Sequence, residues 1–224
     1  MQTDLPILGV PMEAVPMGAP KVKPRLTVDE YLAMERAAQE RHVYLDGEVF
    51  AMAGESDWHG LITISIILAL GPQLKKGPCQ LRTKDTKVRS GPIPERGRGT
   101  KGMFSYPDVL VVCGDREFHD AHKDIILNPK VVIEVLSEST EAFDRGGKFT
   151  RYQTYNPTLT DYVLVSQDKP QVEHFHKPAT GPWTYQLYTG LDAVVLLDSI
   201  GCTLRLTDVY DRVVFETPDE EVKS

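Results

Sequence analysis

The segment Val131-Val132-Ile133-Glu134-Val135-Leu136 places one carboxylate inside a run of aliphatic residues. A short β-branched apolar run of this kind predicts an interior β-strand. Burying a carboxylate costs free energy unless the group is paired or bound to a metal. The alternatives are that Glu134 faces solvent at a sheet edge or forms a salt bridge in the core. This segment therefore predicts both a central strand and a candidate functional residue.

A second acid precedes another predicted interior strand. Asp108 follows Pro107 and opens the run Val109-Leu110-Val111-Val112. Two strand carboxylates that lie close together could share a hard divalent cation, because such ions prefer oxygen ligands, and Mg²⁺ fits this description. The pair Asp108 and Glu134 therefore predicts a site for Mg²⁺, with Mn²⁺ as a possible substitute.

A predicted helix over residues 141–155 follows the strand of Glu134 and ends at Asn156-Pro157. Asp144, Lys148 and Tyr152 are spaced four residues apart, so they share one helix face. From that face Lys148 could point toward the strand carboxylates and orient a water or neutralise a phosphate. The alternative from the spacing is an ordinary surface pair between Asp144 and Lys148.

Upstream residues predict a helix, a hairpin and a second helix. Thr27 and Glu30 fit a capping box that begins the first helix. Asp46-Gly47 separates two short apolar runs, which predicts a two-residue hairpin turn. Ser56 or Asp57 caps a helix that extends to about Leu74. Downstream of Gln171, residues 172–176, 184–188 and 203–206 predict antiparallel strands. The order indicates a mixed α/β fold without regular βαβ alternation.

Composition indicates one globular domain with two atypical ends. The chain has 224 residues, of which 41% are hydrophobic and 25% charged. Five prolines in residues 1–24 predict an extended arm, and residues 211–224 form an acidic tail. The longest apolar run, residues 61–70, is too short to span a membrane. No signal-peptide pattern opens the chain, so we expect a cytoplasmic protein without membrane attachment.

The three cysteines, Cys79, Cys113 and Cys202, are odd in number and widely spaced. They predict neither a disulfide framework nor a thiolate zinc site. His174 and His176 lie on one face of a predicted strand, and we expect them to be surface residues, because we find too few further ligands for a metal site.

The charge of the chain is uneven. The formal net charge is −7, which argues against a dedicated nucleic-acid binder. Residues 82–101 nevertheless carry +5, and the remainder carries −12. We expect phosphate contacts from the first four cations of this stretch, Arg82, Lys84, Lys87 and Arg89. The alternative is a solvated loop, and residues 90–102 are rich enough in Gly, Pro and Arg to predict a mobile one.

The residues resemble those of the Uma-type endonuclease family, a branch of the PD-(D/E)XK restriction endonuclease-like superfamily. The resemblance extends over residues 26–176, and the segments that carry it are Leu26-Thr27-Val28-Asp29-Glu30-Tyr31-Leu32, Asp46-Gly47-Glu48-Val49, Met52-Ala53-Gly54, His59, Tyr106-Pro107-Asp108-Val109, Val132-Ile133-Glu134-Val135-Leu136-Ser137, Asp144, Lys148, Tyr152 and Asp161-Tyr162-Val163-Leu164-Val165. It implies a single restriction endonuclease-like domain over residues 25–210. In this α/β core, helices flank a mixed central sheet whose first strand would lie near residues 79–89, with the helix and hairpin before the core and antiparallel strands after it.

The resemblance also implies roles for individual residues. Asp108 and Glu134 match the two metal-binding acids, and Lys148 matches a lysine that has moved onto the following helix. The chain departs from the superfamily motif because Leu136, not lysine, stands two residues after Glu134. Glu48 and His59 match an acid and a histidine that accompany the site. Glu48 would be a third metal ligand or a group that positions water, and the alternative to a catalytic His59 is a capping or core-edge histidine.

The implied function is Mg²⁺-dependent hydrolysis of phosphodiester bonds in DNA. We also expect a homodimer, in which the proline-rich arm and the C-terminal strands dock between subunits. The alternative is a catalytically inactive protein with the nuclease fold that acts in binding or in homo-oligomeric assembly.

Overall fold

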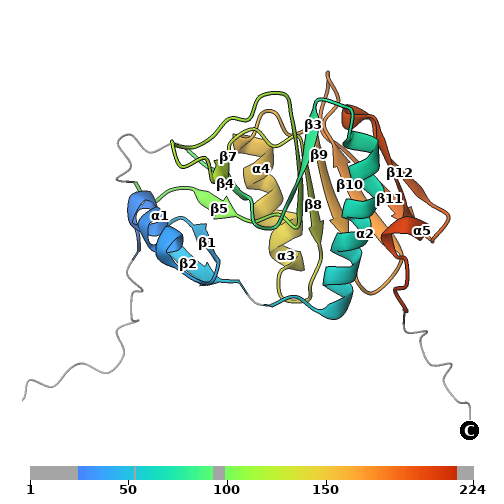
Figure 1. Cartoon of the computed structure of the whole chain (residues 1–224), viewed down its shortest axis with the longest axis horizontal. Coiled ribbons are helices and arrows are strands. Elements are labelled where there is room, and N and C mark those ends of the chain that lie inside the picture. The colour runs from blue at the N-terminus through green and yellow to red at the C-terminus, as the bar shows by residue number, and fades with distance from the viewer. Residues whose placement is uncertain (1–24, 53, 93–98, 216–224) are drawn as a thin grey trace, which may run out of the picture.

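The computed structural model describes residues 25–52, 54–92 and 99–215 (Figure 1). The predicted proline-rich arm, residues 93–98 of the predicted mobile loop and residues 216–224 of the predicted acidic tail lie outside these ranges.

A six-stranded sheet forms the centre of the molecule, in the order β11-β10-β9-β8-β6-β3. Its strands are β3 (Cys79–Thr83), β6 (Val109–Cys113), β8 (Val131–Val135), β9 (Asp161–Val165), β10 (Gln171–His176) and β11 (Thr184–Thr189). Only the β8–β9 pair is parallel, while the other neighbouring strands of this sheet are antiparallel. The predicted mixed central sheet is therefore confirmed.

A second sheet of five strands lies beside the first, in the order β2-β1-β5-β4-β7. Its strands are β1 (His42–Leu45), β2 (Glu48–Ala51), β4 (Lys87–Ser90), β5 (Met103–Ser105) and β7 (Ile125–Ile126). The predicted hairpin joins β1 to β2, and Asp46 and Gly47 at its turn have φ angles of 48° and 97°. These left-handed angles suit the Asp-Gly sequence of the turn.

The helices are α1 (Val28–Ala37), α2 (Asp57–Leu74), α3 (Glu141–Phe143), the π-helical turn η2 (Asp144–Lys148), α4 (Phe149–Tyr155), the 3₁₀ turn η3 (Asp198–Ile200) and α5 (Leu206–Val209). The predicted capping box of α1 is present, since the Thr27 and Glu30 side chains each bond the other's backbone N–H. Ser56 is the N-cap of α2. No helix in the described ranges is both long and apolar enough to cross a membrane.

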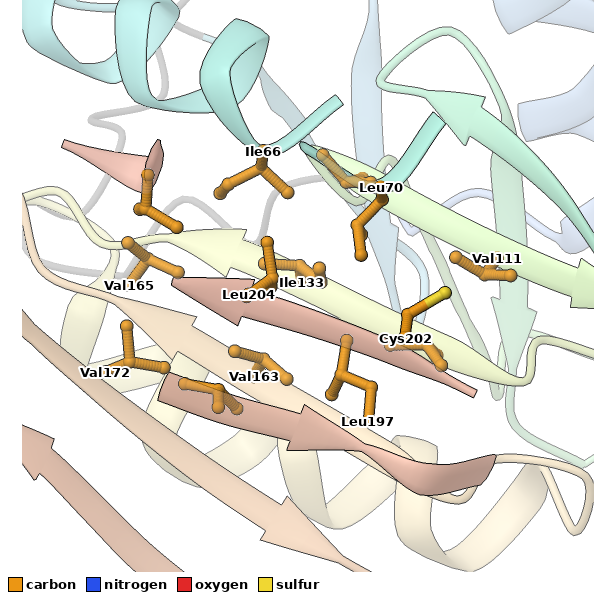
Figure 2. Close-up of a cluster of buried hydrophobic side chains, with 14 of the residues drawn as sticks. Ile66, Leu70, Val111, Ile133, Val163, Val165, Val172, Leu197, Cys202 and Leu204 are labelled. Atoms are coloured by element: carbon orange, nitrogen blue, oxygen red, sulfur yellow. The ribbon is translucent and has the colours of Figure 1, made fainter. Parts of the chain in front are cut away.

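Side chains on the two faces of the six-stranded sheet alternate, as strand geometry requires. In β6, β8 and β9 the odd-numbered residues, such as Ile133 and Val163, pack against Ile66 and Leu70 of α2, whereas in β10 the even-numbered Val172 belongs to this face. The same layer contains the two-stranded sheet of β12 (Val194–Leu197) and β13 (Cys202–Arg205), which contributes Leu197 and Leu204 (Figure 2). Even-numbered residues, including Val132 and Leu164, pack against Tyr152 of α4 on the opposite face.

Two expectations about this part of the chain were wrong. The single strand expected near residues 79–89 is two strands, β3 and β4, which a turn at Thr83–Thr86 separates and which belong to different sheets. The absence of a disulfide was also a wrong prediction, because Cys79 and Cys113 are bonded to each other. These cysteines are directly opposed on β3 and β6, with Cα atoms 3.9 Å apart. Strand register, not sequence spacing, brings them together.

Candidate functional site

Glu134 lies near the carboxyl end of β8, on the face that α3, η2 and α4 cover. Its side chain is 4% exposed, and the Lys148 ammonium from η2 lies 2.8 Å from its Oε1. Lys148 also donates a hydrogen bond of 2.9 Å to Asp144 Oδ1, one turn earlier. Oε1 of Glu134 is buried and has no partner with hydrogen-bond geometry. One ammonium therefore serves two buried carboxylates.

Asp108 lies immediately before β6, next to Glu134. Val109 and Ile133 are opposed across the antiparallel β6–β8 pair, so the next opposed positions are Asp108 and Glu134. Opposed side chains in a sheet point to the same face. The backbone N–H of Val135 donates to Asp108 Oδ2 at 2.8 Å, which fixes the Asp108 carboxylate beside the strand of Glu134.

His59, in the first turn of α2, holds the other oxygen of Asp108. Its Nε2 lies 2.9 Å from Asp108 Oδ1, and because the carboxylate accepts, Nε2 is the donor. Glu55 Oε2 lies 4.0 Å from the same nitrogen, and the Glu55 carboxylate pairs with the ammonium of Lys84. The predicted residues His59, Asp108 and Lys84 therefore form one chain of contacts at the rim of the sheet.

Burial dominates the electrostatics of the acid pair. It raises the pKa of Glu134 to about 8, because the Lys148 ammonium only partly offsets desolvation and the neighbouring Asp144 and Asp108 charges. Burial opposes the charged form of Lys148 as well, but the Glu134 and Asp144 carboxylates outweigh it and hold the pKa of Lys148 above its usual value. Lys148 is therefore an ammonium at neutral pH, while Glu134 readily takes up a proton.

Not every predicted site residue joins this cluster. Glu48 is on β2 of the other sheet, its side chain is 45% exposed, and it pairs with Arg25 at 3.7 Å. In the part of the chain that the structure describes, no hydrogen bond or ion pair links Glu48 to Asp108 or Glu134.

Two of the predicted phosphate contacts are core residues. Lys87 is 5% exposed and lies 3.6 Å from Asp124, and Arg89 is 3% exposed and donates to the Pro92 carbonyl at 2.6 Å. Burial lowers the pKa of both cations. Neither Lys87 nor Arg89 is accessible to a ligand, because both side chains are buried by tertiary packing.

The other two predicted phosphate contacts remain accessible. Lys84 follows β3 and is 32% exposed. Arg82 is partly exposed and lines a cavity of about 180 Å³ with Arg116 and Lys123. Both are on the β3 side of the sheet, where Lys84 reaches His59 through Glu55.

Sequence reasoning missed Asp144 and Glu55 as members of the site. Asp144 was recognised only as part of a helix face, although its spacing of four residues from Lys148 was the signal for a contact between them.

The interpretation of His174 as a surface residue was wrong. His174 is 5% exposed and bonded to Asp161 at 2.8 Å, while His176, bonded to the same oxygen, keeps a third of its side chain accessible.

Comparison with protein families assigns the chain to a family. The Uma2 model, described as "Putative restriction endonuclease", matches residues 28–207. The chain belongs to the Uma2 family. This Uma2 protein is 34% identical over 192 residues to the uncharacterised protein slr1290 of Synechocystis sp., a match that covers 86% of this chain and 95% of that one. It is 30% identical over 170 residues to sll1609 of the same organism, covering 76% and 91%.

A solved structure supports the same fold. The crystal structure of a "putative nuclease belonging to DUF820" from Anabaena variabilis aligns with a TM-score of 0.65 at 15% identity, and the alignment covers 84% of the Uma2 chain and 99% of the other. At that identity the likeness shows the fold alone. The predicted α/β architecture is thus confirmed, and so is the predicted family.

Proposed function

We propose that this Uma2-family protein is a Mg²⁺-dependent nuclease that hydrolyses phosphodiester bonds of DNA at Asp108, Glu134 and Lys148. The observation that carries the proposal is the position of Asp108 and Glu134 at opposed positions on one sheet face, with the Lys148 ammonium 2.8 Å from Glu134. The family description "Putative restriction endonuclease" and a fold neighbour described as a "putative nuclease" favour the same chemistry.

The donors present fit a hard divalent cation. Asp108 and Glu134 offer carboxylate oxygens, the ligand type that Mg²⁺ and Mn²⁺ prefer. The Glu134 carboxylate is buried and shares its one ammonium partner, Lys148, with Asp144, so an added cation would offset a charge that is only partly balanced. When bound, such a cation supplies Lewis-acid charge that activates water and offsets negative charge on the phosphate.

The remaining groups act through position and charge. His59 and the Val135 N–H hold both oxygens of Asp108, so the carboxylate keeps one orientation. Lys148, as an ammonium, can donate to an anionic phosphate oxygen or to the attacking water. Lys84, which reaches His59 through Glu55, and Arg82 on β3 are accessible cations that would hold the DNA backbone without reading its sequence.

The test uses the full chain with supercoiled plasmid DNA and Mg²⁺ or Mn²⁺. We expect nicking that EDTA abolishes. Asp108→Asn and Glu134→Gln should each reduce it by roughly 100-fold or more, because loss of a metal ligand removes several kcal/mol of transition-state stabilisation. Asp115→Asn and Glu138→Gln, which alter exposed acids close in sequence, are the matched controls and should cleave normally.

Failure of the wild-type protein to cleave DNA with either ion would refute the nuclease proposal. The runner-up function is a catalytically inactive nuclease fold used in binding or assembly, which the occupation of Glu134 by Lys148 favours. Calorimetry separates the two, since the inactive protein should show no Mg²⁺ binding that depends on Glu134. Light scattering on the same sample tests the proposed homodimer.

A further inference from the structure

A second cluster of potential metal ligands lies at the start of β9 and the end of β10. His176 is directly opposed to Asp161 across this antiparallel pair, and His174 is two residues away on the same face. His174 Nε2 and His176 Nδ1 each lie 2.8 Å from Asp161 Oδ1. One ligand atom from each residue therefore falls within 4.8 Å of the others.

The surroundings of this cluster hold its ligands in place. Asp161 is fully buried, and its second oxygen accepts hydrogen bonds from Thr160 Oγ1 at 2.9 Å and from the Ser199 hydroxyl. These two donors fix the plane of the carboxylate. His174 and His176 also line a cavity of about 170 Å³, whose wall includes the carboxylate of Asp198. The three ligands thus converge from inside the protein, and open space lies on their outer side.

We propose that Asp161, His174 and His176 bind a divalent transition metal ion, with Zn²⁺ as the best-fitting class. Two imidazoles and one carboxylate suit Zn²⁺, whereas Mg²⁺ prefers oxygen ligands alone. Three protein ligands beside a cavity leave a further position for water, Asp198 or a small ligand, as in zinc sites that are not closed. Thr160 and Ser199 act as the outer partners that orient a ligating carboxylate.

This site is separate from the Asp108–Glu134 site. Asp161 belongs to the odd-numbered series of β9 with Val163 and Val165, which faces α2 and β12–β13. Glu134 belongs to the even-numbered series of β8, which faces α4. The sites therefore lie on opposite faces of the sheet, and the second does not depend on the nuclease proposal.

The test is titration of the tag-free, EDTA-treated full chain with Co²⁺ as a visible probe for Zn²⁺. We expect one equivalent of Co²⁺ to produce d–d absorption bands that one equivalent of Zn²⁺ then abolishes. His174→Ala and His176→Ala should each weaken Zn²⁺ binding by more than about tenfold in competition with a chromophoric chelator. His122→Ala removes an exposed histidine and is the matched control, and Glu134→Gln should leave the affinity unchanged.

Two outcomes would overturn the proposal. One is the absence of stoichiometric Co²⁺ bands in the wild-type protein, which would make the cluster a hydrogen-bonded triad only. The other is a His176→Ala variant with wild-type affinity and a native circular dichroism spectrum. His176 is partly exposed, so this variant keeps the test decisive even if His174→Ala fails to fold.

Discussion

Glu134 titrates far from the usual range of a glutamate, and this has a measurable effect on stability. Its pKa is raised from 4.5 to about 8 in the folded protein. Between these values the folded state keeps a proton that the unfolded state releases, so the contribution of Glu134 to stability falls as the pH rises. Glutamine has no proton to release in this range. We therefore expect the free energy of unfolding of Glu134→Gln, relative to that of wild type, to increase between pH 4.5 and pH 8 by at least about 1.4 kcal/mol, the equivalent of one pKa unit.

Urea unfolding of both proteins at a series of pH values measures this difference. Glu138→Gln changes an exposed glutamate nearby and should show a difference from wild type that does not vary with pH. A constant difference for Glu134→Gln as well would mean that the folded and unfolded pKa values of Glu134 are alike.

The π-helical turn η2 is the element that carries Lys148, and it contains two adjacent glycines. A Cβ at Gly146 would meet nothing within 4 Å, whereas a Cβ at Gly147 would lie 3.0 Å from the Phe143 ring. Gly146→Ala should therefore raise the free energy of unfolding by roughly 0.5–1 kcal/mol, since alanine reduces the entropy of the unfolded chain. Gly147→Ala should gain less or lose stability, because the Phe143 ring must move.

Thermal unfolding of the two variants side by side tests this account of η2, because each serves as the control for the other. Equal shifts in melting temperature would show that the contact with Phe143 does not constrain the turn.

Local patterns in the sequence predicted the elements well. The capping box of α1, the Asp-Gly turn and the apolar runs of β6 and β8 depend on neighbouring residues, so sequence alone is sufficient to identify them. Asp108 and Glu134 could be singled out for the same reason, since a carboxylate beside or within an apolar run is costly wherever the strand lies.

Features that depend on register or on the choice of sheet could not be predicted in this way. The contact of Asp161 with His174 and His176 exists because β9 and β10 pair in one particular register. Arg89 belongs to a stretch rich in cations, yet it is buried because β4 joins the second sheet and places its guanidinium over the Phe104 ring at 5.6 Å. The pairing of strands that are distant in the sequence decides whether such a residue is buried and which residues it contacts.

At the scale of the whole molecule, one covalent link ties β3 to β6. Cys79 and Cys113 are 34 residues apart, and the loop-entropy model assigns a bridge of that span roughly 4 kcal/mol of stabilisation. We expect urea unfolding to show a loss of about this size when the protein is reduced. Alkylation after unfolding without reductant should label Cys202 alone, the free cysteine of the chain. Labelling of all three cysteines would contradict the bridge.

The opposed positions of Asp108 and Glu134 also bear on how this gene can change. The two acids meet through the register of β6 and β8, and the connection of residues 114–130 contributes neither carboxylate. Insertions in its exposed part, residues 114–117, would leave the two acids opposed. A single inserted codon inside β8 ahead of Glu134 would instead turn the carboxylate toward α2, because successive strand residues face opposite sides.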